Sequence, residues 1–474
     1  MPAVSDPPHR PRAASRVDAR TARILGGPLG LTVFSLAWPP LGEQLLNSAV
    51  SFVDIWLAGH LPESVDADAV AVTTAVGFAA YVSWLGSMVA TLIGIGTGAL
   101  VSRFWGSGRR RAAGLVMNRS VALSFVLGSA FAGLIAWQAE AIARLLADDD
   151  LVLETTVRFL RLETLGYPAL TIGLIAAAAL RGAGDMLTPL LILIGINAVN
   201  CVTSFWLSLV GLPGGGPLGA DGIVAGTVVA RWAGAAAILA FLATGRSGLR
   251  LDPRQWKLWG PTVRRVVRIG APAAMDSMVF WTGQMLFLWI IAQVGEAALA
   301  AHFVDIRIES LTYLSATAFG AAAATLIGQN LGAKHDARAR RGGHVAALQA
   351  VAFAVGVSVL FILAADRVLA VMTDSEDVRA AALPPLRLVG WFQVPLAMSI
   401  VYVAALRGAG QTRLPVLITA TTTYAVRLPL VWLLAVEWGY GLTGAWAAMC
   451  ADMLLRGVFA WGLYSRLRWE RTRV

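Results

Sequence analysis

The chain has 474 residues, of which 57% are hydrophobic and 14% charged, and its mean hydropathy is +0.68. Soluble domains carry about 25% charged residues, so this much apolar surface predicts a protein that lies in lipid. The formal net charge of +10 comes from arginines that stand between apolar runs. That arrangement is typical of membrane loops and argues against a nucleic-acid partner.

The apolar runs are about 20 residues long, whereas the strands of a membrane barrel alternate over about 10 residues. A spanning segment must satisfy its own backbone hydrogen bonds, and a helix does so within itself. We therefore predict an all-α integral membrane protein with twelve transmembrane helices.

The predicted helices fall into two sets of six. Residues 1–27 are polar and lack the apolar stretch of a cleavable signal, so we expect a disordered cytoplasmic tail there. An N-lobe at 28–245 holds predicted helices near 31–59, 69–102, 115–138, 157–180, 187–210 and 221–243. A basic cytoplasmic linker is expected at 246–268. A C-lobe at 269–465 holds predicted helices near 269–293, 298–327, 346–364, 384–406, 414–436 and 441–464, and 466–474 form a cytoplasmic tail.

The connecting segments alternate in charge. The basic set comprises the N-terminal tail and residues 103–111, 246–268, 334–341 and 466–473. The neutral or acidic set comprises residues 63–68, 148–150, 211–222 and 374–377. Because basic loops remain in the cytoplasm, we expect both termini to be cytoplasmic.

A motif recurs between the two halves. Residues 179–185 read ALRGAGD and residues 405–411 read ALRGAGQ, an offset of 226 residues, and Gly106 and Gly332 share that offset. Each half has an even number of predicted helices, so both halves enter the membrane from the same side. This predicts two parallel six-helix repeats around a central cavity, an architecture of transporters. A bundle whose repeats serve packing alone is the alternative.

These residues resemble the multidrug and toxic compound extrusion (MATE) family over nearly the whole chain after the tail. The resemblance rests on the paired LRGAG motifs and on the segments 39–59, 307–310, 324–332 and 427–429. It implies two six-helix lobes that form a V around a central cavity. It also implies export of drug-like, often cationic or amphipathic compounds in exchange for H⁺ or Na⁺. The details look closest to the DNA-damage-inducible (DinF) branch.

Two departures from the family pattern bear on the coupling ion. Several branches carry a carboxylate on the fifth helix, four residues after an asparagine, where this chain has Ser204. The branch that uses Na⁺ carries a glutamate on the seventh helix, where this chain has Phe280. A hard cation needs several oxygen ligands at once, so these departures favour H⁺. We expect no metal site and no cofactor.

A polar stripe in the first predicted helix provides the candidate for ion coupling. Glu43 precedes Asp54 by eleven residues, so the two share a helix face within about 20°. Asn47 lies on that face and Ser51 at its edge. Charged residues inside a membrane mark functional sites by default, so we expect Asp54 to carry the coupling proton, with Glu43 assisting. The alternative is a polar seam that bonds neighbouring helices.

Further polar residues are candidates for lining the cavity and binding substrate. They are Asn197, Asn200 and Ser204 on the fifth helix, Asp276 and Gln284 on the seventh, and Asp305 and Glu309 on the eighth. The asparagines could instead serve as ordinary links between helices. Asp305 could instead be solvated near the outer surface.

Pro39 predicts a bend in the first helix. Proline has no N–H, so the carbonyl of Ser35 loses its helical partner, and such a bend is a candidate hinge beside the polar stripe. The alternative is that Pro39 and Pro40 merely open the helix, where proline is tolerated.

Charged residues in the last two predicted helices have structural interpretations. Asp452 and Arg456 have i,i+4 spacing, which predicts an ion pair. Arg427 lies near the start of the eleventh helix and is interpreted as an interfacial anchor.

The sequence and the family resemblance together predict a secondary antiporter that exports small molecules in exchange for protons. Its placement in the plasma membrane of a bacterium is what the resemblance implies. We expect a monomer whose partners are its substrates and the lipid bilayer. A flippase for lipid-linked precursors of the same superfamily and a Na⁺-coupled multidrug antiporter are the alternatives. An enzyme is disfavoured, because the sequence shows no cluster of catalytic groups.

Overall fold

The structure is a computed structural model that describes residues 16–59, 61, 69–146, 150–211, 216–373 and 375–471. The first half contains α1 (Arg16–Gly26), α2 (Leu29–Gly59), α3 (Ala69–Gly106), α4 (Arg110–Leu146), α5 (Asp150–Thr164), α6 (Tyr167–Gly182), α7 (Leu187–Leu209) and α8 (Ala220–Ala243). A short helix, η1 (Pro253–Gln255), lies in the linker. The second half contains α9 (Pro261–Val294), α10 (Glu296–Gly332), α11 (Asp336–Leu363), α12 (Ala365–Met372), α13 (Glu376–Gly390), α14 (Gln393–Gly408), α15 (Arg413–Ala420), η2 (Thr421–Arg427), α16 (Leu428–Val431), η3 (Trp432–Glu437), α17 (Gly441–Arg466) and η4 (Trp469–Arg471).

These helices form six membrane-length units in each lobe, as predicted. Eight described segments are long and apolar enough to cross a membrane, and the run from α15 to η3 counts as one of them. The bent pairs α5–α6 (48°) and α13–α14 (60°) add one unit each. The remaining two units are α2 (31 residues), which contains Pro39 and Pro40, and α17 (26 residues), which carries Asp452 and Arg456. Both are long enough to cross a membrane but are not among the segments that are also apolar enough.

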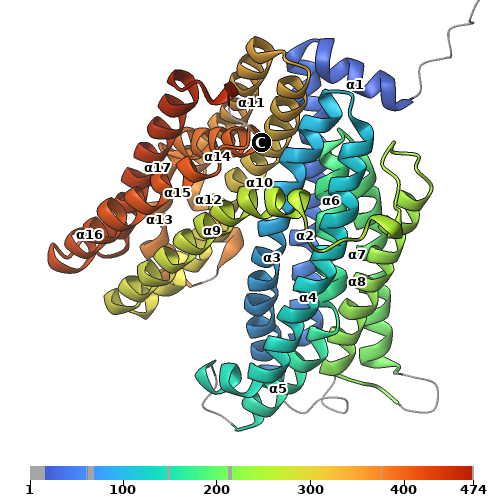
Figure 1. The fold of residues 1–474 in the computed structure, drawn as a ribbon. Helices are drawn as coiled ribbons and strands as arrows, with labels where there is room; N and C mark the ends of the chain where they lie inside the picture. The colour runs from blue at the N-terminus through green and yellow to red at the C-terminus, as the bar shows by residue number, and fades with distance from the viewer. Residues whose placement is uncertain are drawn as a thin grey trace, which may run out of the picture.

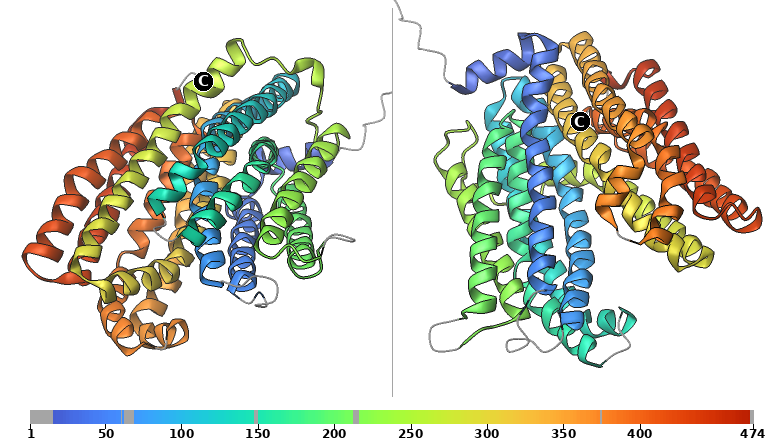
Figure 2. Two further views of the ribbon diagram at one scale, coloured as in Figure 1. Left: turned by 90° about the horizontal axis from the view of Figure 1, so that it is seen from below. Right: turned by 180° about the vertical axis from the view of Figure 1, so that it is seen from behind.

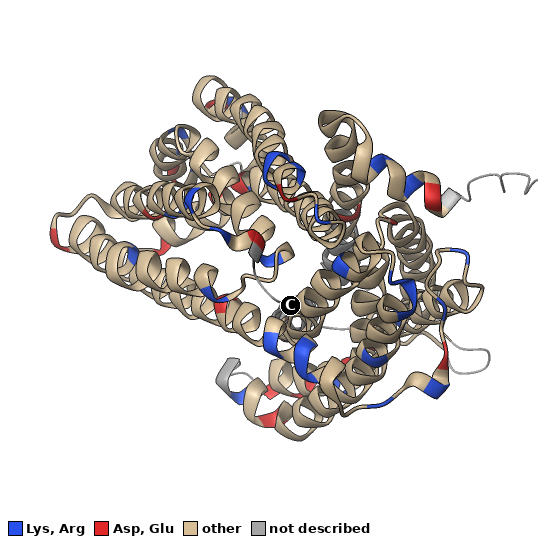
Figure 3. Cartoon of the chain, turned by 45° about the horizontal axis from the view of Figure 1, so that its top comes forward, with Lys and Arg blue, Asp and Glu red and all other residues tan. Residues whose placement is uncertain are grey.

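The two lobes form a V. In Figures 1 and 2 the helices α2–α8 and α9–α17 lie side by side near α1 and diverge towards the opposite end. Helix α1 and the C-terminal end of the chain lie at the end where the lobes meet. Figure 3 turns this end towards the reader and shows Lys and Arg positions, coloured blue on the ribbon, along it.

The lobes meet where α3 crosses α10. A Cβ placed on Gly106 would lie 1.9 Å from the carbonyl oxygen of Gln329, and one on Gly332 would lie 2.1 Å from the carbonyl oxygen of Arg103. Both distances are far below van der Waals contact, so only glycine permits this approach. Gln329 and Gly332 follow Arg103 and Gly106 by the 226-residue offset of the repeat. The crossing therefore obeys the symmetry of the repeat.

Side-chain hydrogen bonds from α10 to the N-lobe reinforce this crossing. The Gln329 amide donates to the carbonyl oxygen of Gly182 at 2.9 Å, and the Thr325 hydroxyl donates to that of Arg181 at 3.1 Å. Residues 181 and 182 belong to the LRGAG motif at the end of α6. The recurring motif is thus part of the contact that joins the lobes.

The end of the predicted disordered tail is instead helix α1, so that prediction is wrong for residues 16–26. Ile24 is buried, and its carbonyl oxygen accepts hydrogen bonds from Asn330 and Arg338 of the C-lobe. On the N-lobe side, Arg20 forms an ion pair with Asp185 at 3.0 Å. Contacts with both lobes hold this short helix, and its own composition does not reveal them. The linker also ends early, because α9 begins at Pro261 rather than near residue 269.

We expect Gly332→Ala to destabilise the closed end of the V. Its new methyl group would overlap the backbone of α3, and overpacking of this kind costs about 1–3 kcal/mol. The matched control is Gly356→Ala on α11, where an added Cβ meets nothing within 4 Å. That control should leave stability unchanged or raise it slightly, since alanine favours helix over glycine. The measurement is the thermal unfolding midpoint of each purified variant in detergent, and equal midpoints for the two variants would contradict the crossing.

Candidate functional site

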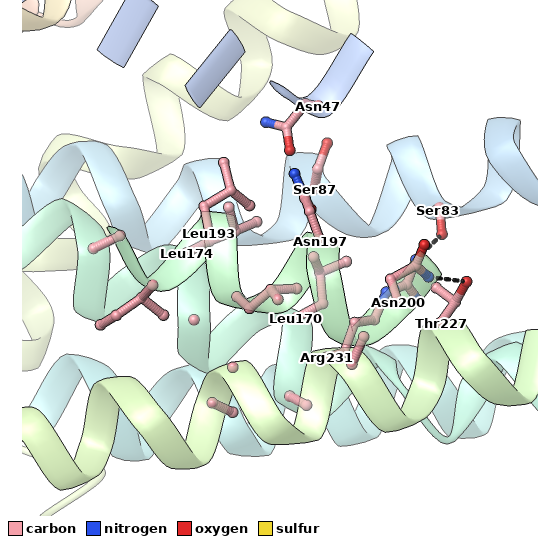
Figure 4. A pocket seen from close by; sticks show the side chains of 18 of the residues that line it. Asn47, Ser83, Ser87, Leu170, Leu174, Leu193, Asn197, Asn200, Thr227 and Arg231 are labelled. Carbon is pink, nitrogen blue, oxygen red and sulfur yellow. Dashed lines mark hydrogen bonds between the residues drawn. The ribbon is translucent and has the colours of Figure 1, made fainter. Parts of the chain in front are cut away.

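A cavity of about 620 Å³ lies inside the N-lobe. Its wall is mainly apolar and comes from α2, α3, α5, α6, α7 and α8. Leucine and isoleucine side chains such as Leu170, Leu174 and Leu193 form much of the lining (Figure 4). Polar groups occur at separate places along this wall. A mainly apolar wall with a few placed polar groups is the usual form of a small-molecule site.

An ion pair between α2 and α6 forms one polar part of the wall. Arg181 Nη1 lies 2.9 Å from Glu43 Oε2, and both side chains are largely buried. Arg181 comes from the first LRGAG motif, at the C-terminal end of α6. Glu43, predicted to assist ion coupling, therefore lines the cavity, but it does so as the partner of an arginine.

A second buried ion pair joins α5, α8 and α3. Arg231 Nη2 lies 3.0 Å from Glu163 Oε1 and donates to the Ser83 hydroxyl at 2.9 Å. The Ser83 hydroxyl also donates to Glu163, and the Tyr167 hydroxyl donates to the other carboxylate oxygen at 3.3 Å. The carboxylate of Glu163 is thus satisfied by groups from three helices.

The predicted asparagines lie along the cavity wall on α7. Asn47, Ser87 and Asn197 gather at one place in Figure 4, and Asn200 lies farther along with Thr227. The Asn200 amide donates to the Thr227 hydroxyl at 3.0 Å, which joins α7 to α8. Asn197 and Asn200 therefore both line this N-lobe cavity, and Asn200 also links two helices.

Three predicted residues of the N-lobe do not fall on the described cavity wall. The side chains of Ser51 and Asp54 lie outside the described part of the chain, although both residues belong to α2. Ser204 is 1% exposed and packs against Gly226 of α8, and its hydroxyl donates to the Ile223 carbonyl oxygen at 3.2 Å. The prediction that Ser204 faces the cavity is wrong, because α7 and α8 approach each other closely at this residue.

The C-lobe repeats the ion pair between a motif arginine and its first helix. Arg407, which corresponds to Arg181 in the second LRGAG motif, forms an ion pair with Asp276 of α9. Asp276 is 4% exposed and stands four residues after Pro272, just as Glu43 stands four residues after Pro39. Each lobe thus holds the same unit of proline, acid and arginine.

The interior of the C-lobe also contains buried charge. Asp452 accepts two hydrogen bonds from Arg456, at 2.8 and 3.0 Å, so the predicted ion pair is confirmed. Arg427 is 2% exposed and lies over the ring of Phe287, with its carbon Cζ 4.0 Å from the ring centroid. Its interpretation as an interfacial anchor is wrong, because the π-helical segment η2 turns it towards α9 and α17.

The remaining C-lobe candidates differ in exposure. Gln284 is partly buried on α9. Asp305 and Glu309 are 0% and 7% exposed on α10, so the alternative of a solvated Asp305 is wrong. None of these three residues lines the N-lobe cavity. Among the described residues, no group of three or more His, Cys, Asp or Glu side chains is placed to hold a metal ion.

Pro39 and Pro40 lie inside α2, ten residues or more after its start, so the alternative that they open the helix is wrong. Both are buried, and α2 runs along α10 of the other lobe in this region. The Gln44 amide donates to the Thr317 hydroxyl of α10 at 3.2 Å. A change of bend at Pro39 would therefore move α2 against the C-lobe.

Known proteins that are similar to this chain are transporters. The sequence model of the MatE family matches residues 39–206 and 272–433. The "Probable multidrug resistance protein NorM" of Thermotoga maritima is 26% identical over 454 residues, which cover 93% of each chain. The human "Multidrug and toxin extrusion protein 1" is 23% identical over 465 residues, 97% of this chain and 76% of the human one. The Vibrio cholerae MATE transporter VcmN in its bent form has the same fold, with a TM-score of 0.83 at 20% identity over 94% of this chain and 98% of that one.

We expect the buried pair of Arg231 and Glu163 to show strong coupling in a double-mutant cycle. Arg231→Met alone leaves Glu163 buried without a cation, a change that costs about 3–5 kcal/mol. Combining it with Glu163→Gln removes the uncompensated charge and should recover most of that loss. The thermal midpoints of the two single variants and the double variant in detergent give the coupling. Additive losses would show that the two side chains act independently.

Proposed function

The chain belongs to the MatE family, and from this membership we propose that it exports small amphipathic organic compounds in exchange for protons. It is a multi-pass membrane transporter and not an enzyme. The N-lobe cavity carries the proposal, because it combines a volume of about 620 Å³ and an apolar wall with a few polar groups. We propose that an apolar substrate body packs on this wall while its polar group bonds to Asn197 or Asn200.

Asp54 is the proposed proton carrier. It follows Glu43 on α2 by three helical turns, and so shares its helix face. The carboxylate of Glu43 is already engaged by Arg181, in an ion pair at 2.9 Å. The exchangeable proton is therefore assigned to the other acid of the stripe. A carboxyl group removed from water favours its protonated form until a cation or a path to water is offered.

A fixed positive charge in the C-lobe supports H⁺ over Na⁺. The guanidinium of Arg456 lies over Phe280, with Cζ 5.5 Å from the ring centroid. Phe280 occupies the position at which the Na⁺-using branch of the MATE family carries a glutamate. The phenyl ring offers no oxygen ligand, and the carboxylate of Asp452, which binds Arg456 through both of its oxygens, is already occupied by a cation. A Na⁺ ion needs several oxygen ligands at once.

The proposed cycle couples two fluxes through one lobe. Protonation of Asp54 from outside and binding of substrate from inside are mutually exclusive, so each favours a different orientation of the lobes. Each proton that enters across 100 mV of membrane potential contributes about 2.3 kcal/mol to export. We place the protein in a bacterial inner membrane as a monomer, with both termini cytoplasmic, because the connections at the α1 end are basic.

Transport by purified protein in liposomes tests the proposal. With a fluorescent amphipathic dye as substrate, an imposed pH gradient should drive dye transport in the absence of Na⁺. A Na⁺ gradient at equal pH should not drive it. Transport that requires Na⁺ and ignores the pH gradient would overturn proton coupling, and movement of a lipid-linked precursor without any dye transport would favour the flippase alternative.

We expect Asp54→Asn to abolish dye accumulation against a gradient, because asparagine keeps the size of the side chain but cannot titrate. The variant should still insert in the membrane, since removal of a charge lowers the cost of insertion. Glu43→Gln is the matched control and should have a milder effect, because Glu43 serves as an arginine partner. The measurement is dye efflux from cells with equal amounts of each variant in the membrane. Normal pH-driven efflux by Asp54→Asn would remove Asp54 from the mechanism.

We expect Pro39→Ala to slow transport while leaving the cavity intact. Alanine restores the hydrogen bond to the Ser35 carbonyl and straightens α2, which opposes movement against α10. Pro385→Ala, a change inside α13 and away from the cavity, is the matched control. Transport rate and dye affinity in liposomes are measured together, and a wild-type rate for Pro39→Ala would exclude the hinge.

A further inference from the structure

A carboxyl group on α10 has no partner in the described structure. Asp305 is 0% exposed, and neither of its carboxylate oxygens has a hydrogen-bond partner among the described residues. Residues 302, 305, 309 and 312 follow helical spacing, and His302, Glu309 and Thr312 are buried on the same face. Arg307 is exposed and stands on another face of the helix. The acid therefore points into protein and not into lipid or water.

The cations nearest in the fold belong to other acids. Arg456 binds Asp452 through two hydrogen bonds, and Arg427 lies 3.9 Å from Asp452 and acts electrostatically on Glu309. Several charged and titratable groups occur on the elements packed around this half of α10. They are Glu296, His302, Arg307, Glu309 and Tyr313 on α10 itself, Arg427 on η2, Cys450, Asp452 and Arg456 on α17, Glu376, Asp377, Arg379 and Arg387 on α13, and Asp276 paired with Arg407 between α9 and α14. Arg387 is paired with Asp366. Arg427 and Arg456 thus both face Asp452, and none of the described cations forms an ion pair with Asp305.

A buried carboxylate with neither a cation nor a hydrogen-bond donor is too costly to persist as an ion, so this group holds a proton. We propose that Asp305 is a second proton-binding site of the transporter, located in the C-lobe, and that its proton is exchanged during the transport cycle. The part concerning exchange rests on the proton coupling proposed above.

The position of Asp305 suits exchange. Insertion of an acidic residue into the middle of a membrane helix costs about 2.5–3.5 kcal/mol of free energy. No described hydrogen bond of Asp305 compensates for this cost. It lies nine residues from the start of α10, about 14 Å along the helix and far from the glycine crossing at the other end. Its helix face packs inside the C-lobe, where His302 contacts Phe287 of α9 and Trp446 of α17. Water can therefore reach the proton only when α10 moves relative to α9 and α17, so access would depend on the conformation of the C-lobe, as coupling requires.

Infrared spectroscopy tests the binding of the proton without any gradient or substrate. Full-length protein in lipid nanodiscs is titrated from neutral to alkaline pH, and the C=O stretch of protonated carboxyl groups is recorded. We expect one band to disappear on titration in the wild type and to be absent at every pH in Asp305→Asn. Asp366→Asn, at an exposed pair with Arg387, is the matched control and should keep the band. Identical spectra for Asp305→Asn and wild type, or a band that no pH removes, would overturn the proposal.

A second variant guards against loss of the fold. Asp305→Leu replaces a neutral carboxyl group with an apolar side chain of similar size, so it should keep the wild-type elution profile and lack the same band. If Asp305 were instead ionised and held by a cation, Asp305→Leu would leave that cation buried, and the variant would misfold. Such misfolding would also count against the proposal.

Flux measurements test the exchange. With one proton on Asp54 and one on Asp305, the limiting accumulation of dye changes about a hundredfold for each unit of pH gradient, and with a single proton about tenfold. Asp305→Asn should therefore reduce this dependence from about a hundredfold to about tenfold. Asp54→Asn should still abolish it, because Asp54 is the site whose protonation excludes the substrate, and the proton on Asp305 cannot drive export without that exclusion. An unchanged dependence would refute the exchange. If pH fails to drive export even in the wild type, the proposed function fails, and the infrared titration still decides whether Asp305 binds a proton.

Discussion

The architecture depends on one steric constraint, the approach of the α3 and α10 backbones at Gly106 and Gly332. A side chain at either glycine would occupy the space of a carbonyl oxygen of the opposite helix. The contact joins the lobes at one end and leaves them free to diverge at the other (Figure 1). It also brings the side chains of α10 within reach of the LRGAG carbonyls, so the recurring motif and the crossing form one structure.

The crossing also determines where the motif arginines and their acidic partners lie. Each motif arginine lies where a helix ends against the opposite lobe, and each turns back to an acid on the first helix of its own lobe. Glu43 and Asp276 are therefore occupied, and they fix the position of their helices. The acids that we propose for proton exchange, Asp54 in one lobe and Asp305 in the other, stand farther from the crossing along their helices. On this proposal the structural acids and the titrating acids are separated along the membrane normal.

Much of the fold could be predicted because lipid constrains it strongly. Long apolar runs located the helices, and a fixed offset of 226 residues revealed the repeat. Partners on different helices could not be found in this way, since helical spacing orders residues within one helix only. The pair of Glu163 and Arg231 was missed for this reason, and Ser204 was misplaced because Gly226 of another helix determines its surroundings. The acidic partners of the motif arginines could have been found from the sequence. In the first helix of each half, a proline is followed four residues later by the acid that forms the ion pair. The DinF-like branch stays a prediction.

The reciprocity of the crossing bears on how such a chain could have arisen. Residue 106 meets residue 329 and residue 332 meets residue 103, which is the pattern of an isologous interface between two identical subunits. A single six-helix ancestor with these glycines would already have carried both sides of the contact and could have assembled as a homodimer. Fusion of two gene copies would then have kept the interface while allowing the sequences of the two halves to diverge. Only after such a fusion could one lobe acquire the cluster around Arg427 while the other kept a cavity lined by asparagines.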